Sequence, residues 1–154
     1  MNNAYENECD MEAAVAAGRH RQVVGDLWDE LGSLQFNFLI SNGLKPNHTL
    51  IDIGCGSLRG GVRFVPYLDP ANYYGVDISK ALLRAGYERE IVPAGLADRL
   101  PASNLRSTSD FDICWPEVLF DYGLAQSLFT HLPLSLTERC LTVTRQHFAP
   151  NGLF

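Results

Sequence analysis

A glycine-rich turn with an acid in front of it is the segment of this sequence best suited to bind a ligand. Asp52 precedes Gly54 by two residues, Gly56 follows, and residues 50–61 read LIDIGCGSLRGG. The glycines permit a tight turn and close approach of the backbone to a ligand. Dinucleotide-binding enzymes seat a pyrophosphate over such glycines, but a carboxylate would repel it, and Arg59 replaces the third glycine of their pattern. The turn therefore favours a ligand with an ammonium group, to which the carboxylate can bind. The alternative is that these are ordinary turn glycines after a strand.

A second acid stands at a spacing typical of ribose recognition. Asp77, in the segment GVDIS, lies 21 residues after Gly56, close to the roughly 20 residues expected for an acid that binds a ribose. Its two carboxylate oxygens can accept hydrogen bonds from two ribose hydroxyls. The alternative is an acid placed at a helix N-terminus, where the helix dipole favours it. Ser79 is a sufficient N-cap without that acid.

A histidine in the segment FDYGLAQSLFTHLP, residues 120–133, is the candidate for proton transfer. Histidine side chains in general can gain or lose a proton near neutral pH, so His131 could act as a general base. The alternative is a histidine at a helix edge that bonds to backbone, because a lone histidine carries little motif information.

Alternating apolar segments predict the elements that position these residues. A helical pattern from Met11 to Gly43, broken near Gly18, carries an apolar stripe of leucines and Phe38. Ser135 and Glu138 predict a capping box that opens the last helix. Residues 150–152 (PNG) are expected to turn the chain into a fifth strand that begins at 153–154. The other predicted elements are strands at 49–53, 73–77, 104–110 and 120–126, and helices at 59–68, 79–91 and 135–148.

Strands that alternate with helices in this way indicate an α/β fold. We predict a doubly wound, Rossmann-like, mostly parallel sheet with helices on both faces, incomplete at the C-terminus. Ligands of such sheets bind beyond the carboxyl ends of the strands, where the strand order reverses. We therefore expect residues 52–61, 77–79, 109–112 and 125–131 to meet in one crevice.

Composition narrows the classes of partner. The 154 residues include 46% hydrophobic and 19% charged residues and carry a formal net charge of −6, which is typical of a globular domain and disfavours binding to a nucleic acid backbone. No apolar run approaches the roughly 20 residues that span a bilayer, and the acidic start is unlike a signal peptide. Four cysteines without metal-ligand spacing predict reduced thiols, no metal site and a cytoplasmic location. A small-molecule partner is expected, with no nucleic acid and no membrane.

Residues 50–56 resemble the first motif of class I S-adenosylmethionine-dependent methyltransferases, hhDhGxGxG, in which h is apolar. The departure is Leu58, which stands where the third glycine usually lies, with Gly60 and Gly61 displaced downstream. The resemblance implies that S-adenosylmethionine is the cofactor. It also implies these cofactor-binding residues: Asp52, Gly54, Cys55, Gly56, Ser57, Asp77, Ile78, Asp110, Phe111 and Gln126.

The resemblance further assigns roles to the residues beyond the first motif. Ile78 is expected to pack against adenine, and Phe111 to cover the ring. Asp110 is expected to accept from the adenine amino group, although Asp112 is close enough to compete and a solvated loop acid is the alternative. Gln126 could hydrogen-bond the methionine part of the cofactor or the methyl acceptor.

A longer resemblance, to a bacterial subgroup of small-molecule-type methyltransferases, covers about residues 18–154. It predicts a partial cofactor-binding domain there, preceded by a mobile or helical segment over residues 1–17, of which 1–10 are expected to fray. In this subgroup the N-terminal helix lies over the crevice, so His20, Arg21 and Trp28 are candidates for lining it, with helix packing as the alternative. The chain stops where the fifth strand begins, which predicts a fragment whose fourth strand is an exposed edge or only partly covered, and a homodimer formed through that edge.

The activity that these resemblances imply is in-line transfer of a methyl group to an undetermined, small-molecule acceptor. The cofactor carries the electrophile, so the protein needs a base only if the acceptor loses a proton. The alternatives are a cofactor-binding module or fragment without turnover, and a nicotinamide-dependent oxidoreductase. A nucleic-acid methyltransferase is disfavoured by charge and by the lack of an asparagine-proline-proline-aromatic tetrad after the fourth strand.

Overall fold

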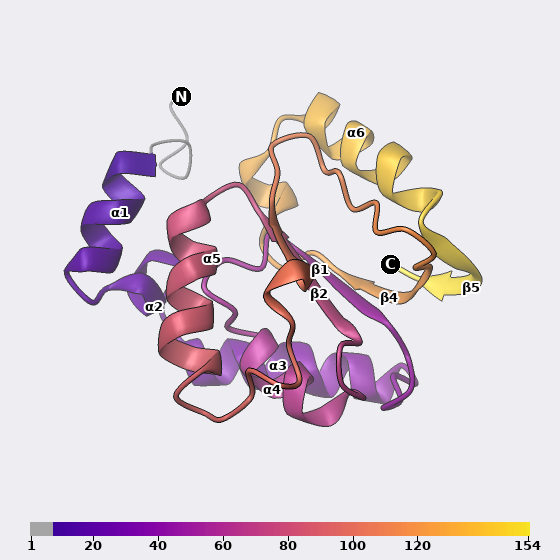
Figure 1. The fold of residues 1–154 in the computed structure, drawn as a ribbon. Coiled ribbons are helices and arrows are strands. Elements are labelled where there is room, and N and C mark those ends of the chain that lie inside the picture. The colour runs from indigo at the N-terminus through magenta and orange to yellow at the C-terminus, as the bar shows by residue number, and fades with distance from the viewer. Residues whose placement is uncertain (1–7) are drawn as a thin grey trace.

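Five strands form one parallel sheet in the computed structural model, which describes residues 8–154 (Figure 1). The strand order is β3-β2-β1-β4-β5, and all neighbouring strands run parallel. The predicted Rossmann-like α/β fold is therefore confirmed. The strands are β1 (Leu50–Ile53), β2 (Tyr73–Asp77), β3 (Leu105–Ser107), β4 (Phe120–Leu124) and β5 (Phe148–Leu153).

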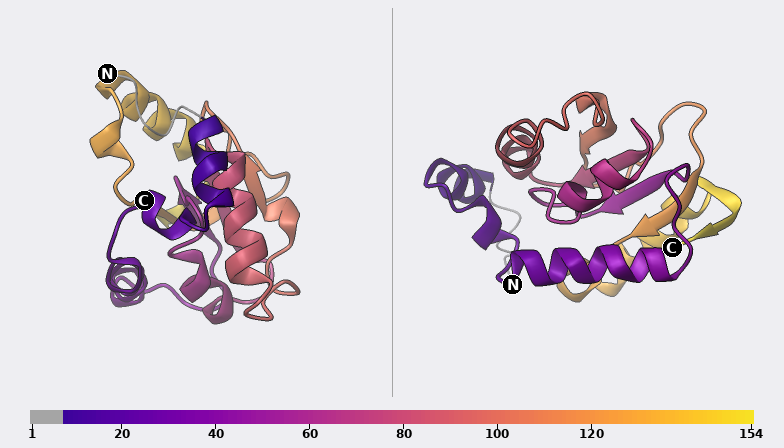
Figure 2. Two further views of the ribbon diagram at one scale, coloured as in Figure 1. Left: turned by 90° about the vertical axis from the view of Figure 1, so that its left-hand side faces the viewer. Right: turned by 90° about the horizontal axis from the view of Figure 1, so that it is seen from below.

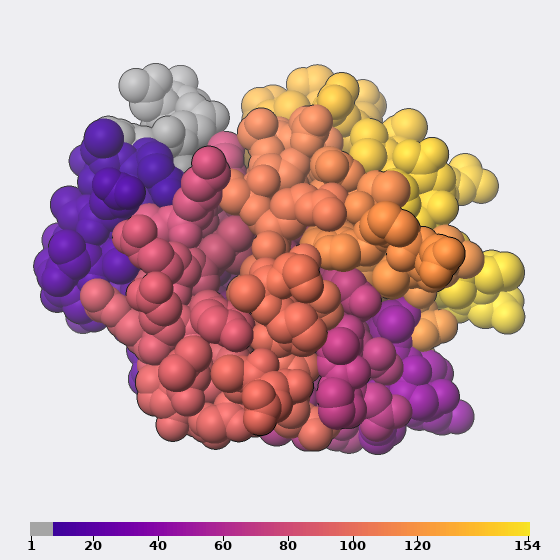
Figure 3. All heavy atoms as spheres, viewed as in Figure 1, coloured from indigo at the N-terminus to yellow at the C-terminus, as the bar shows by residue number. Residues whose placement is uncertain are grey.

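Helices cover both faces of this sheet (Figure 2). Helices α3, α4 and α5 contribute to the core cluster on one face, and α6 contributes to the cluster on the other. In the space-filling view, α5 lies toward the left of the front surface of the molecule, and the orange segment that follows it occupies the centre (Figure 3). The helices are α1 (Glu8–Ala16), α2 (His20–Val23), α3 (Trp28–Ser41), α4 (Gly61–Tyr67), α5 (Lys80–Gly86), the π-helical η2 (Tyr87–Ile91), the short 3-10 helices η3 (Ala102–Asn104) and η4 (Phe129–His131), and α6 (Leu134–Arg145).

Strand β1 is buried at all four positions, as expected for the central strand of a sheet that is covered on both faces. Leu50 packs in the cluster under α3 and α4, whereas Ile51 and Ile53 pack in the cluster under α6. Because successive side chains of a strand point to opposite faces, Asp52 is directed into the α3–α4 layer. The apolar strand thus places one carboxylate inside the fold.

The single broken helix predicted over residues 11–43 is three helices, and its buried face is not the one predicted. The break at Gly18 is confirmed, and a second follows at Gly25 and Leu27, which have φ angles of +97° and +62°. The leucine and phenylalanine stripe lies largely outside: Leu34 and Phe38 are 58% and 59% exposed. Helix α3 instead buries Gly32, Gln35 and Leu39.

Glycine at position 32 explains this orientation of α3. A Cβ atom on Gly32 would lie 3.0 Å from the backbone oxygen of Arg59, so α3 approaches the start of α4 closely on this side. Close packing at Gly32, and not the apolar stripe, therefore decides which face of α3 is buried.

Residues 8–16 form α1, so the predicted fraying over residues 8–10 is not seen, while the prediction for residues 1–7 lies outside the described residues. The last helix has no capping box. Helix α6 begins at Leu134, one residue before Ser135, and its N-cap residue Pro133 makes no side-chain cap bond. Proline there has φ of −58°, close to the helical value, which allows the helix to start earlier than the serine pattern indicates.

The fifth strand starts five residues earlier than predicted and covers the fourth. Phe148 pairs with Phe120 and Leu153 with Tyr122, so β5 spans more residues than the β4 segment it faces, and a register shift absorbs the difference. The sequence Pro150-Asn151-Gly152 lies inside this irregular part of β5 and is not a turn before it. Of the two expectations for the fourth strand, the exposed edge is wrong, because the edges of the sheet are β3 and β5, and β5 pairs with β4 from Phe120 to Tyr122. The third strand is likewise shorter than the predicted 104–110.

Among the described residues, no helix combines the length and the apolar character needed to cross a membrane.

Candidate functional site

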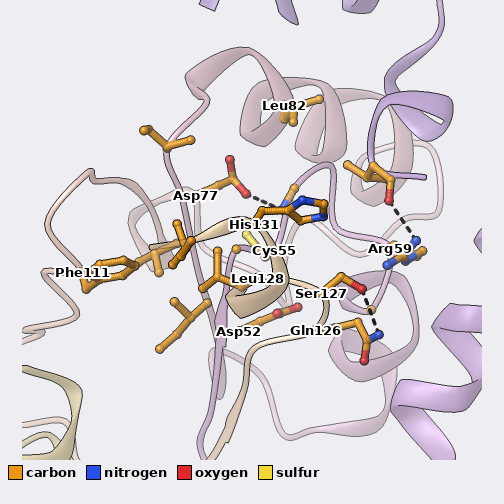
Figure 4. A pocket seen from close by; sticks show the side chains of 18 of the residues that line it. Asp52, Cys55, Arg59, Asp77, Leu82, Phe111, Gln126, Ser127, Leu128 and His131 are labelled. Carbon is orange, nitrogen blue, oxygen red and sulfur yellow. Dashed lines mark hydrogen bonds between the residues drawn. The ribbon is translucent and has the colours of Figure 1, made fainter. Parts of the chain in front are cut away.

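A pocket opens at the carboxyl ends of β1, β2 and β4, where the strand order reverses (Figure 4). All four segments expected to meet there contribute side chains or backbone to it. Of the predicted site residues, it is lined by Asp52, Gly54, Cys55, Gly56, Asp77, Ile78, Phe111, Gln126 and His131. Six further lining residues belong to the expected segments without having been named individually: Ile53, Arg59, Gly60, Ser109, Ser127 and Leu128. The lining residues outside those segments are Val24, Gln35, Val76, Leu82, Thr108, Leu132 and Leu136.

The turn after β1 uses left-handed backbone at three alternate positions. The φ angles are +76° at Gly54, +55° at Gly56 and +67° at Leu58. Leu58 therefore keeps the conformation that suits a glycine, although such a conformation is strained for an L-residue with a side chain. Its side chain is fully buried, and it contacts the positions of Gly61 and Gly86. Packing between α4 and α5 offsets the strain, so Leu58 adopts the φ of a glycine despite the departure from the motif.

Asp52 is a buried carboxylate on the floor of the pocket. Its Oδ2 accepts a hydrogen bond of 2.8 Å from the hydroxyl of Tyr73. Burial, and secondarily the nearby charge of Asp77, raises the pKa of Asp52 to about 7, while the Tyr73 hydrogen bond and the charge of Arg59 act in the opposite direction. Near neutral pH this group therefore gains or loses its charge readily.

Asp77 connects the glycine turn to the start of α5 through two hydrogen bonds. Its Oδ2 accepts from the backbone N–H of Gly56 at 2.8 Å, and its Oδ1 accepts from the backbone N–H of Ser79 at 2.9 Å. Ser79 is the N-cap of α5, as predicted, and its Oγ accepts from the backbone N–H of Leu82. Burial raises the pKa of Asp77, partly offset by these backbone hydrogen bonds. Each oxygen keeps a second lone pair with which to accept from a ligand.

Apolar and hydroxyl side chains line the part of the pocket beyond β2 and β3. Ile78 is exposed at its rim, and Phe111, which has φ of +63°, contributes its ring. Thr108 and Ser109 join them, but Asp110 is not among the described lining residues. The carboxylate of Asp110 accepts from Thr108 Oγ1 at 2.6 Å, which lowers its pKa.

The segment after β4 closes another side of the pocket. Gln126 donates from Nε2 to the hydroxyl of Ser127 at 3.2 Å, and Ser127 has φ of +59°. His131 ends η4 and is exposed at the pocket. Gln126 and His131 thus line the same pocket as the glycine turn.

Cys55 and Ser57 differ in their relation to the pocket. Cys55 lines it from a buried position, and burial raises the pKa of its thiol, so the group stays protonated. Ser57 is fully buried outside the lining, and its Oγ donates to the backbone oxygen of His20 at 2.9 Å. Ser57 therefore joins the turn to α2 through this bond.

The three N-terminal candidates pack against another helix and do not line the pocket. Glu90 on η2 accepts from both Nε and Nη2 of Arg21, at 2.7 and 2.6 Å, and lies 2.8 Å from Nε2 of His20. The guanidinium of Arg21 lies 5.0 Å from the ring centroid of Trp28. The N-terminal region reaches the pocket through Val24 instead, whose backbone oxygen accepts from Arg59 at 3.0 Å.

Two buried polar lining residues, Gln35 and Arg59, were not singled out from the sequence as ligand-binding residues. In the sequence, Arg59 is notable only because it replaces the third glycine of the dinucleotide-binding pattern. Gln35 lies at four-residue spacing between Leu31 and Leu39, so a polar residue interrupting an apolar row of α3 was the available signal.

No family model matches the chain, but solved structures share its fold. A DhpI–SAH complex superimposes with a TM-score of 0.68 at 15% identity, covering 99% of this chain and 68% of that one. Magnesium protoporphyrin IX methyltransferase (ChlM) from Synechocystis PCC 6803 with bound SAM gives 0.64 at 13% identity, covering 96% and 74%. The glycopeptide N-methyltransferase MtfA gives 0.63 at 17% identity, covering 79% and 52%. The chain therefore has the Rossmann-like fold of these methyltransferases.

Proposed function

We propose that this chain binds S-adenosylmethionine in the pocket and transfers its methyl group to a small-molecule acceptor. The observation that carries the proposal is the convergence of Asp52, Asp77 and the left-handed glycine turn on one pocket at the reversal of strand order. Neighbours of the same fold that hold SAM or SAH support it.

The residues present fit the two chemically different parts of that cofactor. Beyond β2, Asp77 offers acceptors for ribose hydroxyls, and Ile78 and Phe111 offer apolar surface for adenine. Beyond β1, Asp52 and Arg59 bring one negative and one positive charge to the same pocket, which suits the zwitterionic amino acid part. A pyrophosphate would meet two carboxylates, which disfavours a nicotinamide dinucleotide.

The cofactor supplies the electrophilic methyl group when bound. The contribution of the protein is to hold both reactants in line, which is worth several orders of magnitude in rate. Leu128, Leu132 and Leu136 line the side after β4, and their apolar side chains are expected to keep water from bound reactants there. His131, exposed at that side, is the candidate to accept a proton if the acceptor loses one. Gln126 is the candidate to orient the acceptor or the methionine part.

Calorimetric titration with S-adenosylhomocysteine tests the proposal. We expect the wild-type chain to bind it, and Asp77→Asn to weaken binding about 10- to 150-fold through loss of charge-assisted hydrogen bonds. The asparagine keeps a carbonyl oxygen for one backbone N–H, so it disturbs the turn less than alanine would. Asp98→Asn removes the same charge from an exposed position outside the lining and should bind like wild type. Titration with NAD⁺ should give no binding. Binding of NAD⁺ in place of S-adenosylhomocysteine would refute the proposal.

A further inference from the structure

Gln35 presents a buried acceptor without a partner in the pocket wall. The residue is 6% exposed and lines the pocket from α3. Its side-chain oxygen Oε1 has no hydrogen-bond partner within residues 8–154. Buried polar atoms are nearly always paired in native proteins, so an acceptor left open at the wall of a pocket indicates that its partner is a ligand.

A second acceptor faces the same point. A Cβ atom on Gly60 would lie 3.0 Å from Gln35 Oε1 and 3.4 Å from Asp52 Oδ2. The two oxygens therefore lie close to each other beside Gly60, on different elements, with the ring of Phe64 at 3.2 Å from the same point. Because Gly60 has no side chain, both oxygens can approach its backbone at the wall of the pocket. Glycine is required here by this close approach and not by backbone conformation, because Gly60 has φ of −73°.

The charges around these oxygens indicate what kind of group fits. Two acceptors, one of them a carboxylate, suit a group with several donors, and an ammonium group carries three. Arg59 lines the same pocket with a guanidinium group, which suits a carboxylate. A ligand with both an amino group and a carboxylate matches this set of side chains.

We propose that Gln35 is a specificity-determining residue of the pocket: its carbonyl oxygen accepts a hydrogen bond from the amino group of a bound α-amino acid moiety, together with Asp52. The inference rests on the proposed cofactor, and it adds that nucleosides without an amino acid part lose this contact. Gln35 lies outside the glycine motif, on a helix that precedes it in the chain, so the selectivity arises from how α3 packs on the turn.

Two ligands and one substitution test the inference. S-adenosylhomocysteine carries the amino acid part, and 5′-methylthioadenosine lacks it. Gln35→Leu has nearly the same size but no acceptor. By calorimetry, we expect it to weaken S-adenosylhomocysteine about 10- to 150-fold, the range for a hydrogen bond to a charged group, and to leave 5′-methylthioadenosine unchanged. Asn37→Ala, which removes an exposed amide from the same helix, is the control and should bind both ligands like wild type.

Thermal melting of the ligand-free variant separates binding from a structural role. Because Gln35→Leu removes an unpaired buried acceptor, its melting temperature should equal or exceed that of the wild type. A lower melting temperature, an equal loss of affinity for both ligands, or unchanged affinity for S-adenosylhomocysteine would each overturn the inference. If Gln35→Leu does not fold, Gln35→Met takes its place with the same expected pattern. Failure of the wild type to bind either nucleoside would instead refute the proposed function, and this inference with it.

Discussion

Replacing Asp52 by asparagine should strengthen the fold and weaken ligand binding at the same time. The carboxyl is fully enclosed, and burial raises its pKa to about 7 in the folded chain. In the unfolded chain an aspartate titrates near 3.9. Ionised Asp52 therefore opposes folding, and it is retained, on this account, because a cationic ligand needs it.

The size of the effect follows from these two pKa values. Each unit of difference corresponds to about 1.36 kcal/mol. The folding penalty is absent below pH 4, grows as the pH rises toward 7 and is constant above that, because the folded carboxyl is then ionised as well. It amounts to about 1.5 kcal/mol at pH 5 and about 4 kcal/mol at pH 8. Asparagine still offers an oxygen to the hydroxyl of Tyr73, so Asp52→Asn should recover up to these amounts.

Ligand affinity should also depend on pH, because it depends on the ionisation of Asp52. A bound ammonium group near Asp52 favours the ionised carboxylate, so binding releases a proton and becomes tighter as the pH rises toward 7, by at most tenfold per pH unit. Above about 7 the affinity should level off. In Asp52→Asn this dependence should disappear and affinity should be low at every pH.

Denaturant unfolding at pH 5 and pH 8, with calorimetric titration of S-adenosylhomocysteine from pH 5.5 to 7.5, measures both effects. Asp98→Asn, which removes an exposed carboxylate, is the matched control and should change neither. If Asp52→Asn destabilises the chain at pH 8, or stabilises it equally at both pH values, the reasoning about burial is refuted.

Two further substitutions test the packing that positions the pocket. In denaturant unfolding, Leu58→Gly should destabilise the chain by about 1 kcal/mol less than Leu58→Ala does. Both variants lose the buried side chain, but only glycine relieves the left-handed φ of +67°. A larger loss of stability for the glycine variant than for the alanine variant would contradict this. Glu90→Gln should cost about 1–3 kcal/mol at pH 7 and less at pH 3. Burial raises the pKa of Glu90, but hydrogen bonds from Arg21 and His20 outweigh it and lower the pKa, so this stability is lost on acidification; an equal loss at both pH values would argue against the ion pair.

Local sequence patterns predicted the centre of the sheet well. The strand ending at Ile53, the glycines after it and the acid at Asp77 were expected from residue order alone, because each depends on near neighbours in the chain. Ser79 as the N-cap of α5 belongs to the same class of local signal. Leu58 adopts the left-handed conformation that suits a glycine, because packing offsets its strain.

Features that depend on tertiary packing were harder to predict. The buried face of α3 follows from close contact at Gly32, which no periodicity of apolar residues reveals. The early start of β5 depends on pairing with β4, and the sequence Pro150-Asn151-Gly152 resembles a turn until that pairing is known. Gln35 was missed because the sequence does not show that this buried polar residue of α3 packs beside the glycine turn.

The most direct measurement is a crystal structure of the chain with S-adenosylhomocysteine. We expect the ligand in the pocket at the ends of β1, β2 and β4, with a ribose hydroxyl within hydrogen-bond distance of Asp77 and the amino group between Asp52 and Gln35. Ligand bound elsewhere, or in the pocket with its amino acid part turned away from Asp52, would contradict this expectation.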